Sequence, residues 1–114
     1  MRSRRDETYS CALDAVVAVV SGKWKGLILW AIRSEPRRFG ELKRLVPRAS
    51  EKMLTQQLRE LQADGIVTRT AYPEVPPRVE YALTERGAEL VELLLPLGDW
   101  AHDHMHMQDG EVRV

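Results

Sequence analysis

The chain has 114 residues and a mass of 13.1 kDa, the size of one domain with short terminal arms. Its 17 basic and 17 acidic residues cancel, which excludes a protein coated in positive charge, and its single cysteine excludes an internal disulfide. No apolar run approaches the ~18 residues of a membrane span. Acidic residues interrupt the segment after the N-terminal arginines, which argues against a secretory signal. We therefore expect a cytoplasmic protein with no membrane partner.

The zero net charge conceals an asymmetry between the two halves of the chain. Residues 1–59 hold 13 basic and 6 acidic residues, a charge of +7, and residues 60–114 hold 4 basic and 11 acidic residues, a charge of −7. Such a division indicates that one half of the chain faces a polyanion. Charged residues on ordinary solvated helix faces can produce the same division.

Two apolar segments predict the first two helices. Residues 11–21 are apolar on nearly all sides, and their length and lack of alternation favour a buried helix over a strand. Gly22 is a natural C-terminal stop for this helix. Residues 23–34 also carry apolar side chains on most faces, which predicts a central, buried helix.

A pair of short helices follows. Residues 39–46 form the first, which is amphipathic. Its apolar side consists of Phe39, Leu42, Leu45 and Val46. After a tight turn, Ser50 stands at the N-cap of a second helix over about residues 50–64. The apolar stripe of this second helix is narrow and consists of Leu54, Leu58 and Leu61.

The hydrophobic period then changes from that of a helix to that of a strand. Residues 66–72 and 78–83 predict the two strands of a hairpin. Three prolines between them cannot supply backbone N–H groups and predict a stiff tip. The side chains expected to point inward from the second strand are Val79, Tyr81 and Leu83. Thr84 is expected to cap a final helix, in which Pro96 produces a kink or a restart.

Two short helices, a tight turn and a hairpin directly after them are the order of a winged helix-turn-helix. We therefore expect a mainly α fold with a small β-hairpin (α+β). The helix at about 50–64 would enter the major groove of DNA, and the wing at about 66–83 would contact the backbone or the minor groove. We expect a flexible arm over residues 1–10, the domain with terminal dimerisation helices over 11–107, and a C-terminal tail over 108–114.

Polar side chains of the 50–64 helix suit base edges, because Arg and Lys bind guanine acceptors and Gln binds adenine. The expected base-reading residues are Lys52, Met53, Thr55, Gln56 and Arg59. Cations and a hydroxyl around them are expected to bind phosphates, which position the protein without reading sequence. These residues are Arg37, Arg38, Lys43, Arg44, Arg48, Ser50, Arg69 and Arg78. The alternative is a solvated helix face beside a hairpin with no partner.

Five short motifs occur in order along most of the chain. They are Gly22-Lys23-Trp24-Lys25, Arg38-Phe39-Gly40-Glu41-Leu42, Lys52-Met53-Leu54-Thr55-Gln56-Gln57-Leu58-Arg59-Glu60-Leu61, Asp64-Gly65, and Pro76-Pro77-Arg78-Val79-Glu80-Tyr81-Ala82-Leu83-Thr84. From about Cys11 to Trp100 the sequence resembles the HxlR-type winged helix-turn-helix transcriptional regulators of bacteria. The resemblance implies a homodimer, a palindromic operator in double-stranded DNA, and repression or activation of nearby genes. We expect no cofactor, and the small-molecule effector stays unknown.

Two positions depart from the pattern of that family. Ala12 stands where proline is usual, which loosens the entry to the first helix. Arg48 and Ala49 stand where glycine and isoleucine are usual, which adds a charge at the turn before the reading helix.

The two ends of the chain carry more apolar side chains than one small core needs. They are Val16, Val17, Val20, Leu90, Leu93, Leu94, Leu97 and Trp100. We expect them to form a dimer interface, which doubles the DNA site with half-sites about one turn (~34–36 Å) apart. The alternative places all of them in the core of one chain, since a leucine stripe at helical spacing usually packs somewhere.

Cys11 is the one residue with latent chemistry. It is expected near the N-terminus of the first helix, where the helix dipole and nearby Arg4 or Arg5 favour a reactive thiolate. In some members of the family that the chain resembles, the cysteine at this position senses oxidants, quinones or aldehydes. Cys11 is therefore a candidate sensor, and the alternative is an inert buried side chain.

Other kinds of function find little support in the sequence. Of the C-terminal histidines, only His102 and His106 would share a helix face, and a metal needs three or four converging ligands, so we expect no metal site. No catalytic or nucleotide-binding motif occurs, and we expect no enzyme. The remaining rival is a winged-helix module that binds protein, which Lys52, Gln56 and Arg59 argue against.

Overall fold

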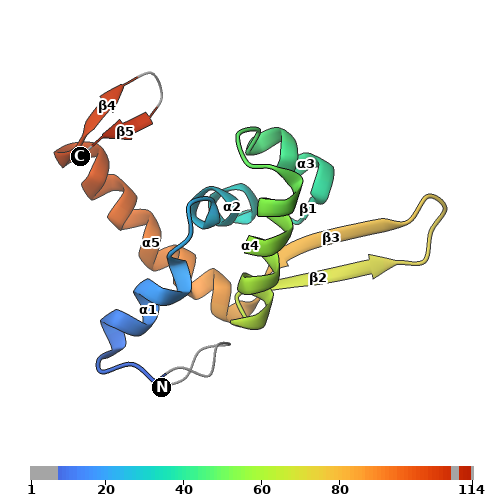
Figure 1. Ribbon diagram of the computed structural model, residues 1–114, viewed down its shortest axis with the longest axis horizontal. Coiled ribbons are helices and arrows are strands. Elements are labelled where there is room, and N and C mark those ends of the chain that lie inside the picture. Colours follow the sequence, from blue (N-terminus) through green and yellow to red (C-terminus); the bar gives the residue numbers. More distant parts are fainter. Residues whose placement is uncertain (1–7, 109–110, 114) are drawn as a thin grey trace.

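The computed structural model describes residues 8–108 and 111–113, with side chains described for residues 8–105. Its helices are α1 (Ala12–Val20), α2 (Lys25–Ile32), α3 (Phe39–Leu45), α4 (Glu51–Ala63) and α5 (Glu85–His104). Its strands are β1 (Arg37–Arg38), β2 (Val67–Tyr72), β3 (Arg78–Leu83), β4 (His106–Gln108) and β5 (Glu111–Arg113). The β2–β3 hairpin projects from one side of the helices, and α5 runs from the base of that hairpin to the opposite end of the molecule (Figure 1). This arrangement confirms the predicted winged helix-turn-helix.

The core lies where α2, α3 and α4 meet the sheet. The stripe predicted on α4 is confirmed, because Leu54, Leu58 and Leu61 have no exposed surface. Val46 is buried as predicted, whereas the prediction for Leu45 is wrong, since 47% of its surface is exposed. α3 ends at Leu45, and Val46 at the C-cap takes the inward position instead.

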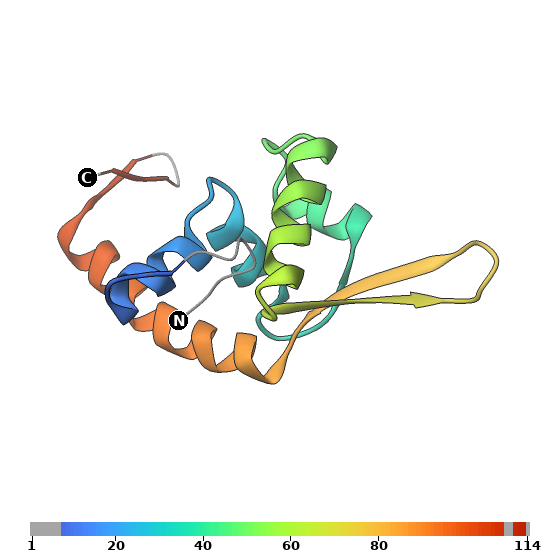
Figure 2. The ribbon, with the colours of Figure 1, turned by 60° about the horizontal axis from the view of Figure 1, so that its bottom comes forward.

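The prediction of a buried first helix is wrong for the single chain. In α1 only Ala15 is buried, and Leu13 and Val17 are exposed over 72% and 49% of their surface. In both views α1 lies near α5 and far from the β2–β3 hairpin (Figure 1 and Figure 2). Within the described residues no single helix is long and apolar enough to cross a membrane. Only α1 and α2 together have the length and composition for it, and they are bent by 81° at the break between them.

The sheet has three antiparallel strands in the order β1-β3-β2. The two strands of the predicted hairpin pair from Val67 with Leu83 to Tyr72 with Arg78. Tyr81 is buried, and its strand also pairs with β1. β1 was not predicted, because a strand of two residues shows no alternation. β4 and β5 form a second, two-stranded antiparallel ribbon. His106 therefore lies in β4 rather than on a helix face shared with His102.

The start of α5 is fastened to the end of α4. Gly65 has φ 74°, the left-handed region in which glycine lacks the usual steric penalty. The Thr84 hydroxyl donates to the Gly65 carbonyl oxygen at 2.6 Å and accepts from the Gly87 N–H at 2.9 Å, which confirms the predicted cap. A Cβ at Gly87 would collide with the carbonyl oxygen of Ile66. α5 then continues through Pro96 as one helix, so the helix does not restart there.

Candidate DNA-binding surface

α4 begins with the cap that the sequence predicts. The Ser50 hydroxyl accepts a hydrogen bond from the Met53 N–H at 3.1 Å, which satisfies one of the free donors at the helix start. The turn before it is short, because α3 ends at Leu45 and α4 begins at Glu51. These features fix α4 with its leucine stripe inward and its polar side outward.

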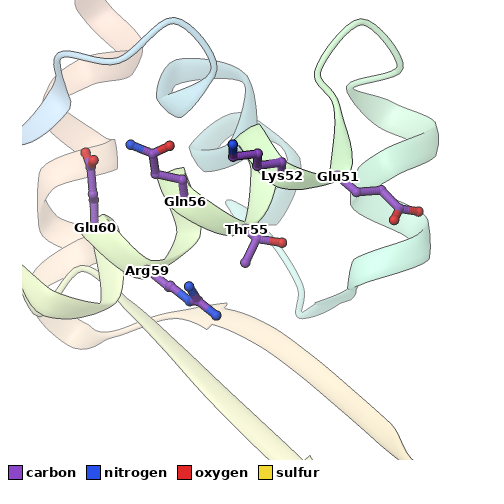
Figure 3. A pocket seen from close by; sticks show the side chains of 6 residues that line it. All are labelled: Glu51, Lys52, Thr55, Gln56, Arg59 and Glu60. Atoms are coloured by element: carbon purple, nitrogen blue, oxygen red, sulfur yellow. The ribbon is translucent and has the colours of Figure 1, made fainter.

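The polar side of α4 forms an open hollow, whose lining side chains Figure 3 shows. Its lining consists of Glu51, Lys52, Thr55, Gln56, Arg59 and Glu60. Lys52, Gln56 and Arg59 are exposed and Thr55 is partly buried. Four of the five expected base-reading residues therefore share one surface. Met53, the fifth, does not line the hollow, although 37% of its surface is exposed.

Two cations near the turn are bonded to the protein itself. Arg37 Nε donates to the Ala31 carbonyl oxygen at 3.0 Å, and its Nη1 lies 2.8 Å from Glu35 Oε1. Lys43 Nζ donates to the Pro47 carbonyl oxygen at 3.0 Å. These side chains hold the loop before β1 and the end of α3, and a phosphate would have to compete with those bonds.

Arg78, next to the hairpin tip, is paired with two carboxylates. Its Nη2 lies 3.1 Å from Glu74 Oε1 and its Nη1 lies 3.3 Å from Glu80 Oε2. Its guanidinium carbon also lies 3.9 Å from the centre of the Tyr72 ring. Two carboxylates thus neutralise Arg78, and the stacked ring stiffens the wing.

A second group of cations is available to an outside partner. Arg38, Arg44 and Arg69 are exposed, and their side chains have no bonding partner among the residues that the structure describes. Arg48 is also exposed, in the turn that leads into α4. Lys52 and Arg59 of the hollow are two further exposed cations.

Beneath this surface lies a buried cation that the sequence analysis did not single out. Lys25, the first residue of α2, has no exposed surface, and its Nζ lies 2.7 Å from Glu60 Oε1 of α4. One turn closer to the start of α4, Gln57 is 7% exposed. A Cβ at Gly22 would collide with the Gln57 side-chain oxygen. The motif from Gly22 to Lys25 is therefore fitted against α4, and its charged residue in an apolar helix was the signal that could have shown this.

Cys11 is exposed, so the expectation in the alternative that it is buried in the core is wrong. It forms the N-cap of α1, and its Sγ accepts from the Asp14 N–H at 3.4 Å. Arg4 and Arg5, expected beside it, lie outside the described residues. The thiol is thus open to reagents at the positive end of a helix.

The apolar side chains of α1 and α5 fall into two groups. Leu90 and Leu94 pack partly against the core. Leu93, Leu97 and Trp100 are exposed over 70%, 62% and 52% of their surface. The alternative that all of these side chains fill the core of one chain is therefore wrong.

The histidine side chains that the structure describes belong to α5, and that of His104 contacts the same helix. His104 Nδ1 lies 2.9 Å from the Trp100 carbonyl oxygen, and its ring stacks on Trp100 at 4.8 Å. Among side chains of residues 8–105, no group of three or more His, Cys, Asp or Glu residues is placed to hold a metal ion.

Comparisons with known proteins agree with this geometry. The family described as HxlR-like helix-turn-helix matches residues 19–109. The HTH-type transcriptional regulator YkvN of Bacillus subtilis (strain 168) is 47% identical over 108 residues, which cover 93% of this chain and 92% of YkvN.

Two solved structures are similar to this fold. The redox regulator HypR in its oxidised form has a TM-score of 0.79 and 41% identity, over 85% of this chain and 100% of that chain. The reduced form of the regulator YodB from B. subtilis has a TM-score of 0.76 and 32% identity, over 89% of this chain and 100% of that chain. The protein therefore belongs to the HxlR-like helix-turn-helix family of transcriptional regulators.

Proposed function

We propose that this protein is a dimeric regulator that binds a palindromic operator in double-stranded DNA, in the cytoplasm, where that DNA lies. The observation that carries the proposal is the open side of α4, on which Lys52, Gln56 and Arg59 are exposed together. An α-helix fits the major groove, and these side chains match guanine and adenine edges. Thr55 and Met53 complete the proposed base-reading set.

Which cations contact phosphates in this proposal depends on whether each side chain is already bonded to the protein. Arg38, Arg44 and Arg69 carry most of them, because no bond within the described residues competes. Arg48 and the capped helix start at Ser50 add contacts at the turn. Arg37, Lys43 and Arg78 contribute less to phosphate binding, because their side chains already bond to carbonyl or carboxylate groups of the protein.

Selection of duplexes from a random pool tests this function. A shared motif among the selected duplexes, bound with an affinity that falls steeply as salt rises, is the expected result, because DNA binding releases counterions. Binding to no duplex, or an affinity that does not change with salt concentration, would favour the alternative of a winged-helix module that binds protein.

The dimer interface of the proposal is the exposed apolar surface of the two terminal helices. Leu93, Leu97 and Trp100 recur along one side of α5, and Val17 of α1 is exposed as well. Val16 and Val20 are partly buried beside it, and Leu90 and Leu94 back the same helix. Apolar side chains exposed in this number are a mark of protein interfaces.

Leu97→Glu is expected to weaken the dimer at least tenfold, because the interface would bury an unpaired carboxylate. Analytical ultracentrifugation over a range of protein concentrations measures the dissociation constant. Leu95→Glu is the matched control, since Leu95 is 43% exposed but lies on nearly the opposite side of α5. A dimer that tolerates Leu97→Glu, or one that Leu95→Glu weakens equally, would exclude this interface.

Cys11 is the proposed sensor of oxidants or electrophiles. It is exposed at the start of α1, and the similar structures include the redox regulator HypR. Diamide converts two thiols into a disulfide, so its action here joins Cys11 to a thiol of another molecule. We expect diamide to lower the operator affinity of the native protein and not that of Cys11→Ser. An equal loss in both proteins, or none in either, would exclude the sensor.

A further inference from the structure

Glu51 is the first residue of α4 and lines the same hollow as the proposed base-reading residues. In Figure 3 it lies at the end of the row nearest α3, and Glu60 lies at the other end. The side chain is exposed. A carboxylate therefore stands on the surface that the proposed function turns toward a polyanion.

The two carboxylates of the hollow differ in their partners. Glu60 Oε1 lies 2.7 Å from Lys25 Nζ, so a buried cation balances its charge. Glu51 has no ion pair with any residue that the structure describes. The Glu51 carboxylate is therefore available to a hydrogen-bond donor of a binding partner.

A phosphate repels the Glu51 carboxylate, whereas a base edge with a hydrogen-bond donor attracts it. A recognition helix places its N-terminal residues on base edges, which is where Glu51 lies. In the major groove cytosine offers an amino donor, whereas guanine and the thymine carbonyl offer acceptors that repel a carboxylate. Adenine offers a donor beside an acceptor, which suits an amide better than a carboxylate.

We propose that Glu51 is a specificity-determining residue, which accepts a hydrogen bond from a cytosine amino group in each half-site and disfavours guanine and thymine there. The inference rests on the proposed DNA-binding function. It assigns Glu51 a selective role: its charge weakens binding to DNA in general and strengthens binding to one base.

Glu51 also has a structural role, because acidic residues stabilise the first turn of a helix. A control variant separates that role from base selection. Glu85 supplies the matched control. It is the first residue of α5, follows the N-cap Thr84 as Glu51 follows Ser50, and is exposed, but it does not line the hollow. Glu85→Gln therefore removes the same charge from the same helix position away from the base-reading residues.

The experiment is selection from a random duplex pool with the native protein, Glu51→Gln and Glu85→Gln, followed by affinities for the selected duplexes. We expect a cytosine in the native half-site that Glu51→Gln no longer selects, with adenine favoured there instead. At that position the native preference for cytosine over guanine is expected to be about tenfold or more, and to fall close to one in Glu51→Gln. Binding of the variant to random DNA should strengthen.

An unchanged motif in Glu51→Gln would overturn the inference and leave the proposed function standing. The same change of motif in Glu85→Gln would also overturn it, because helix stability would then explain both. Failure of the native protein to select any motif would instead overturn the proposed function on which the inference rests.

Discussion

Glu60→Leu is expected to lower the free energy of unfolding by about 3 kcal/mol, because it leaves the Lys25 ammonium buried without its partner. Lys25 has no exposed surface, and its Nζ lies 2.7 Å from Glu60 Oε1. Since 28% of the Glu60 side chain is exposed, water offsets part of the loss, and the lower end of the range for buried pairs applies. Urea unfolding followed by circular dichroism measures the change.

Two further variants show whether the ion pair is the cause. Glu92→Leu makes the same substitution at an exposed position of α5 and should change stability little. The double variant Lys25→Met/Glu60→Leu should recover most of the loss, because apolar side chains of similar volume replace a buried pair at little cost. An equal loss in Glu60→Leu and Glu92→Leu would contradict this account.

Gln56→Ala and Arg59→Ala are each expected to reduce the preference for the selected operator over a scrambled duplex by about 1–3 kcal/mol, or 5- to 150-fold. Each substitution removes a side chain that suits a bidentate bond to one base. Both residues are exposed in the hollow of α4, so the folded state should remain stable. Fluorescence anisotropy with the two duplexes at one salt concentration measures the preference.

Arg86→Ala is the control for Arg59→Ala. Arg86 is an exposed arginine of α5 that does not line the hollow, and its replacement should leave the preference unchanged. If Arg59→Ala instead weakened both duplexes equally, Arg59 would contact phosphate rather than a base, and its assigned role would be wrong.

The periodicity of the sequence predicted the elements that pack in the core. The leucine stripe of α4, its Ser50 cap and the Thr84 cap of α5 are local features, because each depends on side-chain spacing or on one bond to a nearby backbone group. β1 escaped prediction, since a strand of two residues is recognisable only by its partner. The exposed side of α4 followed directly from its narrow stripe.

The environment of each charge did not follow from the sequence. Arg69 and Arg78 both lie in the strands of the hairpin, yet Arg69 is exposed and Arg78 is held by Glu74 and Glu80. Lys25 stands out in the sequence only as a charge in an apolar helix, and its burial against Glu60 of α4 depends on how the two helices pack. Ion pairs between distant segments depend on how the elements pack, and a pattern along one element does not record that.

The sequence alone established the order of the five helices and of the β2–β3 hairpin, the family resemblance and the division of charge between the two halves. Each is a property of spacing along the chain. The tertiary structure established that α1 and the second half of α5 expose apolar side chains, that Cys11 is open to solvent, and that Glu60 is paired while Glu51 is not. An apolar or charged side chain looks the same in the sequence whichever neighbour covers it, and only packing supplies that neighbour.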